Sequence, residues 1–168
     1  MPEPIQLPKA MTDALRSSGV KDSGPDTQAH INRVQELLGE ILKNVIQRGA
    51  YHDRSKLQSP EKEAFDATTE LKGMTYGSDD YKAALERLGP ALKHHYEHNS
   101  HHPEHYINGV WGMSLLDLIE MLADWKAAGE RHADGSMKAS LTKNRSRFGV
   151  DDQLQFILEN TAKEMGWL

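Results

Sequence analysis

The sequence contains no cysteine, no long apolar run and no block of basic residues. Without cysteine the chain can form neither disulfides nor thiolate metal sites, so a transition metal would have to be bound by imidazole and carboxylate. No stretch approaches the roughly 20 apolar residues of a membrane span, and the opening MPEPIQLPKA lacks a signal-peptide pattern. The 20 basic and 25 acidic side chains give a formal net charge of -5, which argues against nucleic acid as a partner. We therefore expect a cytoplasmic protein that binds neither membranes nor nucleic acid.

With 168 residues the chain is long enough for one ordinary domain and too short for two well-packed ones. Apolar residues recur at helical spacing, and no alternating run of strand length is present. The pattern predicts an all-α protein with a loosely ordered arm at 1–25 and a single bundle of six or seven helices at 26–168. Caps, glycines and periodicity predict a loop at 72–78 and helices at 11–16, 26–49, 60–71, 79–98, 114–131, 136–147 and 151–165.

Histidine is unusually concentrated, because six of the nine histidines lie between positions 94 and 105. His95 continues the helical line of Leu88 and Leu92, so we expect its side chain to point into the protein. A surface tract that collects metal ions is the alternative, and the inward register of His95 argues against it.

Two further histidine positions precede this tract. His30 shares the apolar stripe of the helix at 26–49, and we expect it to face inward, as a ligand or as a core histidine with a hydrogen-bond partner. His52 and Asp53 are adjacent and can converge on one ion. Lys56 follows Asp53 by one helical turn, where its ammonium can neutralise a bound phosphate. A solvated charged turn is the alternative for this segment.

An acidic stripe interrupts the otherwise apolar helix at 114–131. Asp117, Glu120 and Asp124 share one face of that helix. Asp117 resembles a capping-box partner of Ser114, whereas Glu120 and Asp124 have no such local explanation. A narrow carboxylate stripe on an apolar helix favours contact with an internal cation or with histidines, and solvent exposure of both residues is the alternative.

The order of these residues on a helical frame resembles that of the HD-domain metal-dependent phosphohydrolases, over roughly residues 29–131. The strings HDRSK, HHPE and EMLADW are also similar to those of small HD-like proteins of bacteria and their phages. HDRSK further resembles the HD-x-x-K string of HD-domain enzymes that cleave cyclic dinucleotides. Pro103 and Glu104 follow His102 in place of the GYP signature of those enzymes, so a cyclic dinucleotide substrate is not implied.

The resemblance implies a metal centre and a reaction. One divalent ion would be bound by His30, His52, Asp53 and Asp124. A second would be bound by His95 with His101 or His102. The metal would be Mn, Co, Ni, Zn, Fe or Mg, and it would activate water to attack a nucleotide or related phosphoester in a bacterial or phage-infected cytosol. The catalytic residues would be Asp53, Lys56 and Glu120. The substrate would be bound by Lys56, Asn99, Lys143, Arg145 and Arg147.

Two other functions would use the same residues. A di-iron oxygenase would carry a mixed-valent iron pair, whereas a hydrolase would depend on Mn, Co, Ni or Mg. A non-catalytic HD-like module would bind a nucleotide or a protein partner without turnover. The sequence leaves open the substrate, the number of ions and self-association into a homo-oligomer.

Overall fold

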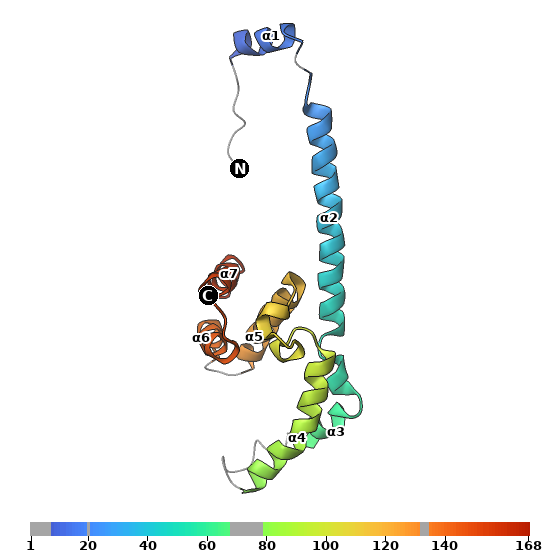
Figure 1. Ribbon diagram of the computed structural model, residues 1–168, viewed down its shortest axis with the longest axis vertical. Coiled ribbons are helices and arrows are strands. Elements are labelled where there is room, and N and C mark those ends of the chain that lie inside the picture. Colours follow the sequence, from blue (N-terminus) through green and yellow to red (C-terminus); the bar gives the residue numbers. More distant parts are fainter. Residues whose placement is uncertain (1–7, 20, 68–78, 132–134) are drawn as a thin grey trace. The chain divides into compact units, whose positions relative to one another are not determined.

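The computed structural model describes residues 8–19, 21–67, 79–131 and 135–168. Within these ranges the chain is helical and has no strand, which confirms the all-α prediction (Figure 1). The α-helices are α1 (Lys9–Ser17), α2 (Gly24–Tyr51), α3 (Glu61–Ala67), α4 (Asp79–His98), α5 (Leu115–Glu130), α6 (Met137–Phe148) and α7 (Asp152–Glu164). Short 3-10 helices are η1 (Arg54–Leu57), η3 (Pro103–His105) and η4 (Gly109–Gly112). None of the helices in the described part of the chain is long and apolar enough to cross a membrane.

The observed helix ends lie within two residues of the predicted ones, except at the C-terminal end of α3. That helix is described up to Ala67, whereas the prediction extends it to 71. The rest of this prediction, and the predicted loop at 72–78, lie outside the described residues. Local sequence signals therefore locate the helices well, because capping and periodicity depend on neighbouring residues alone.

The chain divides into two compact units, residues 1–43 and 44–168. The division falls within α2, so the first unit contains α1 and most of α2. The second unit contains the last turns of α2 and all later elements. The predicted arm at 1–25 and bundle at 26–168 stay a prediction.

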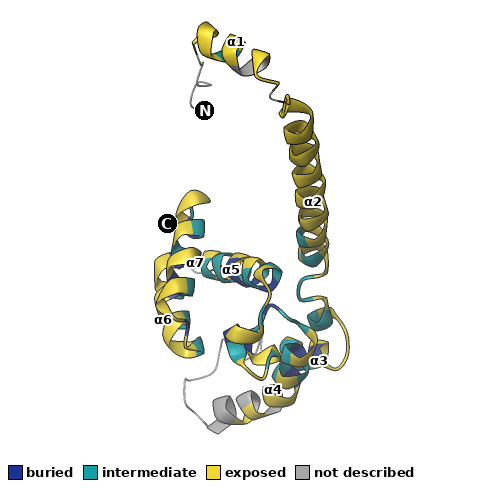
Figure 2. Cartoon of the chain, turned by 45° about the horizontal axis from the view of Figure 1, so that its top comes forward, coloured by how far each residue is buried: buried dark blue, intermediate teal, exposed yellow. Residues whose placement is uncertain are grey.

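No described residue of the first unit is buried, and Figure 2 shows α2 coloured as exposed along most of its length. His30 is exposed on this helix. Nothing in the described part of the first unit packs over His30, so the prediction that His30 points inward stays a prediction. Helical periodicity identifies residues that share a face, but it does not show whether anything packs against that face.

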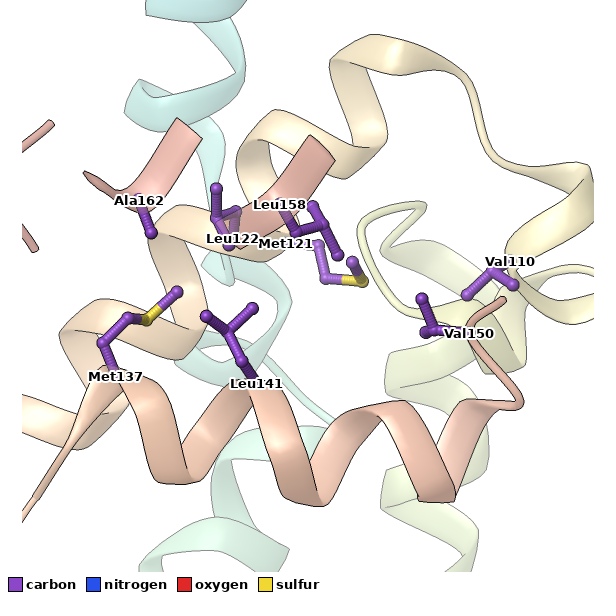
Figure 3. Packing of buried hydrophobic residues seen from close by; sticks show 8 residues of the cluster. All are labelled: Val110, Met121, Leu122, Met137, Leu141, Val150, Leu158 and Ala162. Atoms are coloured by element: carbon purple, nitrogen blue, oxygen red, sulfur yellow. The ribbon is translucent and has the colours of Figure 1, made fainter. Parts of the chain in front are cut away.

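The hydrophobic core of the second unit lies among α5, α6 and α7 (Figure 3). Its buried residues are Val110, Met121, Leu122, Met137, Leu141, Val150, Leu158 and Ala162. Trp125 and Phe148 pack against them with their rings nearly parallel and the ring centroids 6.1 Å apart. One face of α5 therefore packs into the core, and the acidic stripe of this helix is not part of that core.

Caps fix the ends of these helices where the sequence predicts them. The Oγ atom of Ser114 accepts a hydrogen bond from the N–H of Asp117, and the Asp117 carboxylate accepts one from the N–H of Ser114, which confirms the capping box. Ser136 caps α6, and Asp151 caps α7. Gly149 ends α6 with a φ of 63°, a conformation that glycine adopts without strain.

We expect Leu141→Ala to lower the free energy of unfolding by about 2 to 5 kcal/mol, because it would leave a cavity in this core. The Leu141 side chain is only 2% exposed, whereas Leu115, on α5, is 66% exposed. Leu115→Ala is the matched control and should cost less than about 1 kcal/mol. Urea unfolding followed by circular dichroism measures both variants. Equal losses of stability would contradict the assignment of the core.

Candidate metal centre

Six residues that can bind metal ions come together in the second unit. Two of them follow the end of α2, one lies near the end of α4, two lie in the segment after α4, and one lies on α5. The residues are His52, Asp53, His95, His101, His102 and Asp124. Their ligand atoms form two groups, each with all atoms within 4.8 Å of one another. The first group is Asp53, His95, His101 and His102, and the second is His52, His101 and Asp124.

The first group has the spacing of ligands around one ion. Oδ1 of Asp53 lies 3.3 Å from Nε2 of His95 and 3.5 Å from Nε2 of His101. Nε2 of His95 lies 2.9 Å from Nε2 of His102. Ligand atoms bound at 2.0 to 2.2 Å in tetrahedral or octahedral geometry lie about 2.8 to 3.6 Å apart. These three separations therefore fall within the range of ligand atoms bound to one transition metal ion.

Two atoms of this group are buried without a hydrogen-bond partner, namely Oδ1 of Asp53 and Nε2 of His101. Buried polar atoms in folded proteins nearly always have a partner, so each exception needs an explanation. Both atoms can offer a lone pair to the same cation. A bound metal ion would satisfy both at once, and the donor set fits one.

The carboxylates of Glu61 and Glu120 contact three of the histidines through Nδ1, on the side of the ring opposite Nε2. Nδ1 of His95 lies 2.9 Å from a Glu61 oxygen. Oε1 of Glu120 lies 2.9 Å from Nδ1 of His52 and 3.0 Å from Nδ1 of His101. An ionised carboxylate only accepts hydrogen bonds, so each Nδ1 donates and Nε2 is the nitrogen that can bind a metal once it is deprotonated. This arrangement of carboxylate, histidine and metal is common at metal centres.

Glu61 was missed by the sequence analysis, although its side chain is completely buried at the start of α3. It accepts a hydrogen bond from Oγ of Ser55 at 2.8 Å and also contacts Nδ1 of His94 at 2.7 Å. The only sequence signal is an acidic residue in the first turn of a helix, which normally indicates a favourable helix start.

Asn99, predicted to bind substrate, lies beside this carboxylate network. Its side-chain amide donates to Oγ of Ser55 at 2.9 Å and to the backbone carbonyl of His95 at 2.8 Å. These bonds support the orientation of His95. A direct contact of Asn99 with substrate stays a prediction.

The second group shares His101 with the first, and Asp53 lies close to it. Nε2 of His52 lies 3.5 Å from Oδ2 of Asp53 and 3.5 Å from Oδ1 of Asp124. His101 can offer its Nε2 to only one ion, so a second ion requires the two oxygens of Asp53 to face different ions. Lys56 donates to Oδ2 of Asp53 at 2.6 Å on that side.

Asp53 has a positive φ of 56°, which is uncommon for a residue other than glycine. Aspartate tolerates the left-handed region better than most residues. The turn separates α2 from η1, and both His52 and Asp53 reach the cluster from it. Residues held in such conformations concentrate at functional sites.

The histidines keep the nearby carboxylates ionised in the protein without metal. Burial opposes ionisation of Asp53, but the rings of His101 and His95 lower its pKa far below the ordinary value. Burial also opposes ionisation of Glu120, but His101 and His52 lower its pKa to about 2. Both carboxylates are therefore charged at neutral pH and can bind or orient a cation.

The histidines titrate in opposite directions. Hydrogen bonds to the carboxylates of Asp124 and Glu120 raise the pKa of His52 to about 10. Burial and the neighbouring charge of His101 lower the pKa of His102 to about 3. His102 is therefore neutral and ready to act as a ligand, whereas His52 holds a proton that a metal ion must displace.

An ion-pair network joins this cluster to the frame of the second unit. Arg48, near the end of α2, pairs with Asp117 and, at 2.9 Å, with Glu120 on α5. Asp117 also accepts hydrogen bonds from Ser100 at 2.7 Å and from the hydroxyl of Tyr106 at 2.8 Å. Because these partners come from three segments, the network fixes the segments that carry the histidines.

Four other predicted site residues are in neither ligand group. His30 belongs to the first unit and is in neither ligand group, so its role as a ligand stays a prediction. Lys143, Arg145 and Arg147 are exposed on α6. Arg145 and Arg147 pair with carboxylates outside the six ligand residues. Substrate binding by these three cations also stays a prediction.

We expect binding of Zn²⁺ or Mn²⁺ to release protons at pH 7, because the pKa of His52 is about 10 without metal. A group with a raised pKa is protonated below that value, so the apparent metal affinity should rise as pH increases from 6 towards 9. Calorimetry in two buffers that differ in ionisation enthalpy counts the protons. If metal binding released no protons, the protonated state of His52 would be contradicted.

Matched variants identify which histidines bind the metal. His101→Ala should reduce the metal content measured by elemental analysis, whereas His98→Ala should not, because His98 is in neither ligand group and its Nδ1 bonds the carbonyl of His94. His30→Ala tests the remaining ligand prediction in the same assay. Loss of an ion in that variant would add His30 to the ligand set.

Comparison with known proteins gives one match. Residues 19–164 match a family described as a family of unknown function, DUF5662. No curated protein and no solved structure matches the chain. The matched segment covers most of the chain and includes all six residues of the candidate metal centre. The chain therefore belongs to the DUF5662 family.

Proposed function

We propose that the protein is a metal-dependent phosphohydrolase of the HD-domain type that acts on a nucleotide or a related phosphoester. The observation that carries this proposal is the pair of buried, unpartnered atoms Oδ1 of Asp53 and Nε2 of His101, 3.5 Å apart. They lie among histidines that carboxylates contact through Nδ1. The closeness of His52, Asp53 and Asp124 also supports an HD-type ligand set.

The ligand set favours a transition metal over magnesium. Four imidazoles and two carboxylates suit Mn²⁺, Fe²⁺, Co²⁺, Ni²⁺ or Zn²⁺, whereas Mg²⁺ prefers oxygen ligands and keeps several waters. The two ligand groups make room for one ion, or for two if Asp53 bridges them. Two ions would place Asp53 at the centre of the site.

A divalent ion bound there would supply Lewis acidity and lower the pKa of a coordinated water towards about 7. The protein's own side chains would bind the phosphate and position the metal ligands. The ammonium of Lys56 lies beside Asp53 and the Lys56 side chain is 35% exposed, so the ammonium can reach a phosphate and offset charge that grows during the reaction. Glu120 shares its two oxygens among His52, His101 and Arg48, which makes it a positioning residue for the ligands.

A cavity of about 150 Å³ lies against the second ligand group. Its lining includes the ligands His52 and Asp124 together with an apolar wall. The apolar wall consists of Val45, Leu116, Ile119 and Ala123. An apolar wall beside a metal centre suits a small planar or apolar part of a substrate, with the phosphate at the ions. The cavity supports a nucleotide or similar phosphoester as the substrate class.

We expect Asp53→Asn to reduce phosphoester hydrolysis more than about 100-fold, because an amide is a poor substitute for an ionised carboxylate at a metal centre. Turnover of a panel of nucleoside mono-, di- and triphosphates is measured with Mn²⁺, Co²⁺, Ni²⁺ or Zn²⁺ added, beside elemental analysis of metal content. Asp152→Asn, at a 79% exposed side chain, is the control.

Wild-type turnover by Asp53→Asn with metal bound would remove Asp53 from the mechanism. A stoichiometric iron pair together with consumption of O₂ would instead select an oxygenase. Nucleotide binding without turnover would select a non-catalytic module.

We expect Lys56→Ala to leave metal content unchanged and to lower kcat/KM by an amount equivalent to about 2 to 3 kcal/mol, because an ammonium cannot ligate a metal but can pair with a phosphate. Lys62→Ala is a close control. Lys62 also lies 2.6 Å from a carboxylate oxygen, that of Asp66, but is in neither ligand group. Equal kinetics of the two variants would show that Lys56 is a solvated surface residue.

A further inference from the structure

A cavity of about 670 Å³ lies among α5, α6 and α7. All of its lining residues belong to the second unit, so its shape is set within that unit. None of the six residues of the candidate metal centre lines it. The cavity beside the second ligand group is smaller, with a volume of about 150 Å³. Sites for small molecules have roughly 300 to 1,000 Å³, so the larger cavity has the size of a ligand site.

The inner wall of this cavity is apolar and belongs to the hydrophobic core. Met137 and Leu141 line the cavity and are buried in that core (Figure 3). Trp167 also lines it and packs against the same core. Indole and thioether side chains both make favourable contacts with aromatic rings. The wall therefore suits a planar ring.

The position of Trp167 is fixed by the way in which α7 ends. The N–H of Gly166 donates to the carbonyl of Lys163 at 3.0 Å. The N–H of Trp167 donates to the carbonyl of Ala162 at 2.8 Å. These two bonds form a Schellman motif, and Gly166 adopts the positive φ of 68° that the motif requires. The backbone therefore turns at Gly166 and carries the Trp167 side chain back against the core.

The cavity is positively charged, although the chain has a net charge of -5. Three lysines line it together with one carboxylate side chain, that of Glu159. Lys126 pairs with Glu130 at 3.0 Å. Among the residues that the structure describes, neither Lys138 nor Lys163 has an ion-pair partner. Two ammonium groups on flexible stems are therefore available to an anion beside the apolar wall.

We propose that this cavity is a second ligand site, which binds a small aromatic anion. The planar ring would lie against Trp167 and Met137, and the acidic group would pair with Lys138 and Lys163. An apolar wall with a few placed polar groups is the usual composition of such a site. The proposal is independent of the proposed hydrolase activity, because no residue of the candidate metal centre takes part.

Naphthalene sulfonate is the probe, because it joins a planar ring to a permanent negative charge and contains no phosphoester. It is titrated into the isotope-labelled full chain, and the NMR signal of the Trp167 indole N–H reports binding. The chain has three tryptophans, and loss of one signal in Trp167→Phe identifies the reporter. The signal should shift to saturation with a dissociation constant of about 1 mM or tighter, which is reasonable for a ligand of this size.

Two comparison ligands and a chelator define what is recognised. Naphthol lacks the charge and methanesulfonate lacks the ring, so each should bind at least about 10-fold more weakly than the probe. Binding should be the same with and without EDTA. Equal affinity for either comparison ligand, or loss of binding in EDTA, would overturn the proposal, because the anion would then not need both halves of the cavity or would bind at a metal ion.

Charge variants test the two lysines. Lys138→Gln with Lys163→Gln should weaken binding by about 10-fold or more, because both ion pairs with the probe are lost. Lys9→Gln with Lys21→Gln changes the net charge by the same amount outside the cavity and should bind like the wild type. Equal affinity of the two double variants would overturn the proposal.

A variant that fills the cavity tests its position without a change of charge. Thr142 lines the cavity, so Thr142→Trp should abolish binding. Ser146→Trp, on the same helix but outside the lining, is the matched control and should bind the probe normally. The NMR spectrum of each variant also shows whether it is folded. No shift of the Trp167 signal in the wild type, or unchanged binding by folded Thr142→Trp, would overturn the proposal.

Discussion

The carboxylate of Glu120 connects the candidate metal centre to the frame of the second unit. One oxygen lies within hydrogen-bond distance of Nδ1 of both His52 and His101, and the other pairs with Arg48 at 2.9 Å. Arg48 in turn pairs with Asp117, which caps α5. The orientation of two ligand rings therefore depends on the same contacts that start a core helix. A site supported in this way is held more rigidly than one built on loops alone.

The charge balance of the cluster favours the binding of a cation. Several carboxylates are gathered in a largely buried region, and ionised groups are costly to bury unless they are compensated. Without metal, protons on the histidines supply part of the compensation, as the pKa of His52 near 10 indicates. A divalent ion can replace those protons and also satisfy the unpartnered atoms of Asp53 and His101. The same groups would then serve stability and metal binding.

Much of the candidate site could be predicted because its ligands are residue types with a restricted chemistry. Adjacent His52 and Asp53, the inward register of His95 and the acidic stripe with Asp124 all stand out in the sequence. Glu61 could not be identified, because a carboxylate at a helix start is usually solvated and only the packing of α3 against η1 and α4 buries it. The bond of Asn99 to Ser55 depends on the same packing.

The sequence by itself determined the helices, their caps and the faces on which apolar and acidic residues lie. These features depend on neighbours one or two turns away, as in the capping box of Ser114 and Asp117. Only the tertiary structure decided which faces are buried, so that α5 packs its apolar face into a core while nothing in the described part of the first unit packs over the equally periodic stripe of α2. Only the tertiary structure also brought His52 and His101 to one carboxylate. The physical reason is that periodicity records the geometry within a helix, whereas burial and ligand convergence depend on distances between segments remote in the chain.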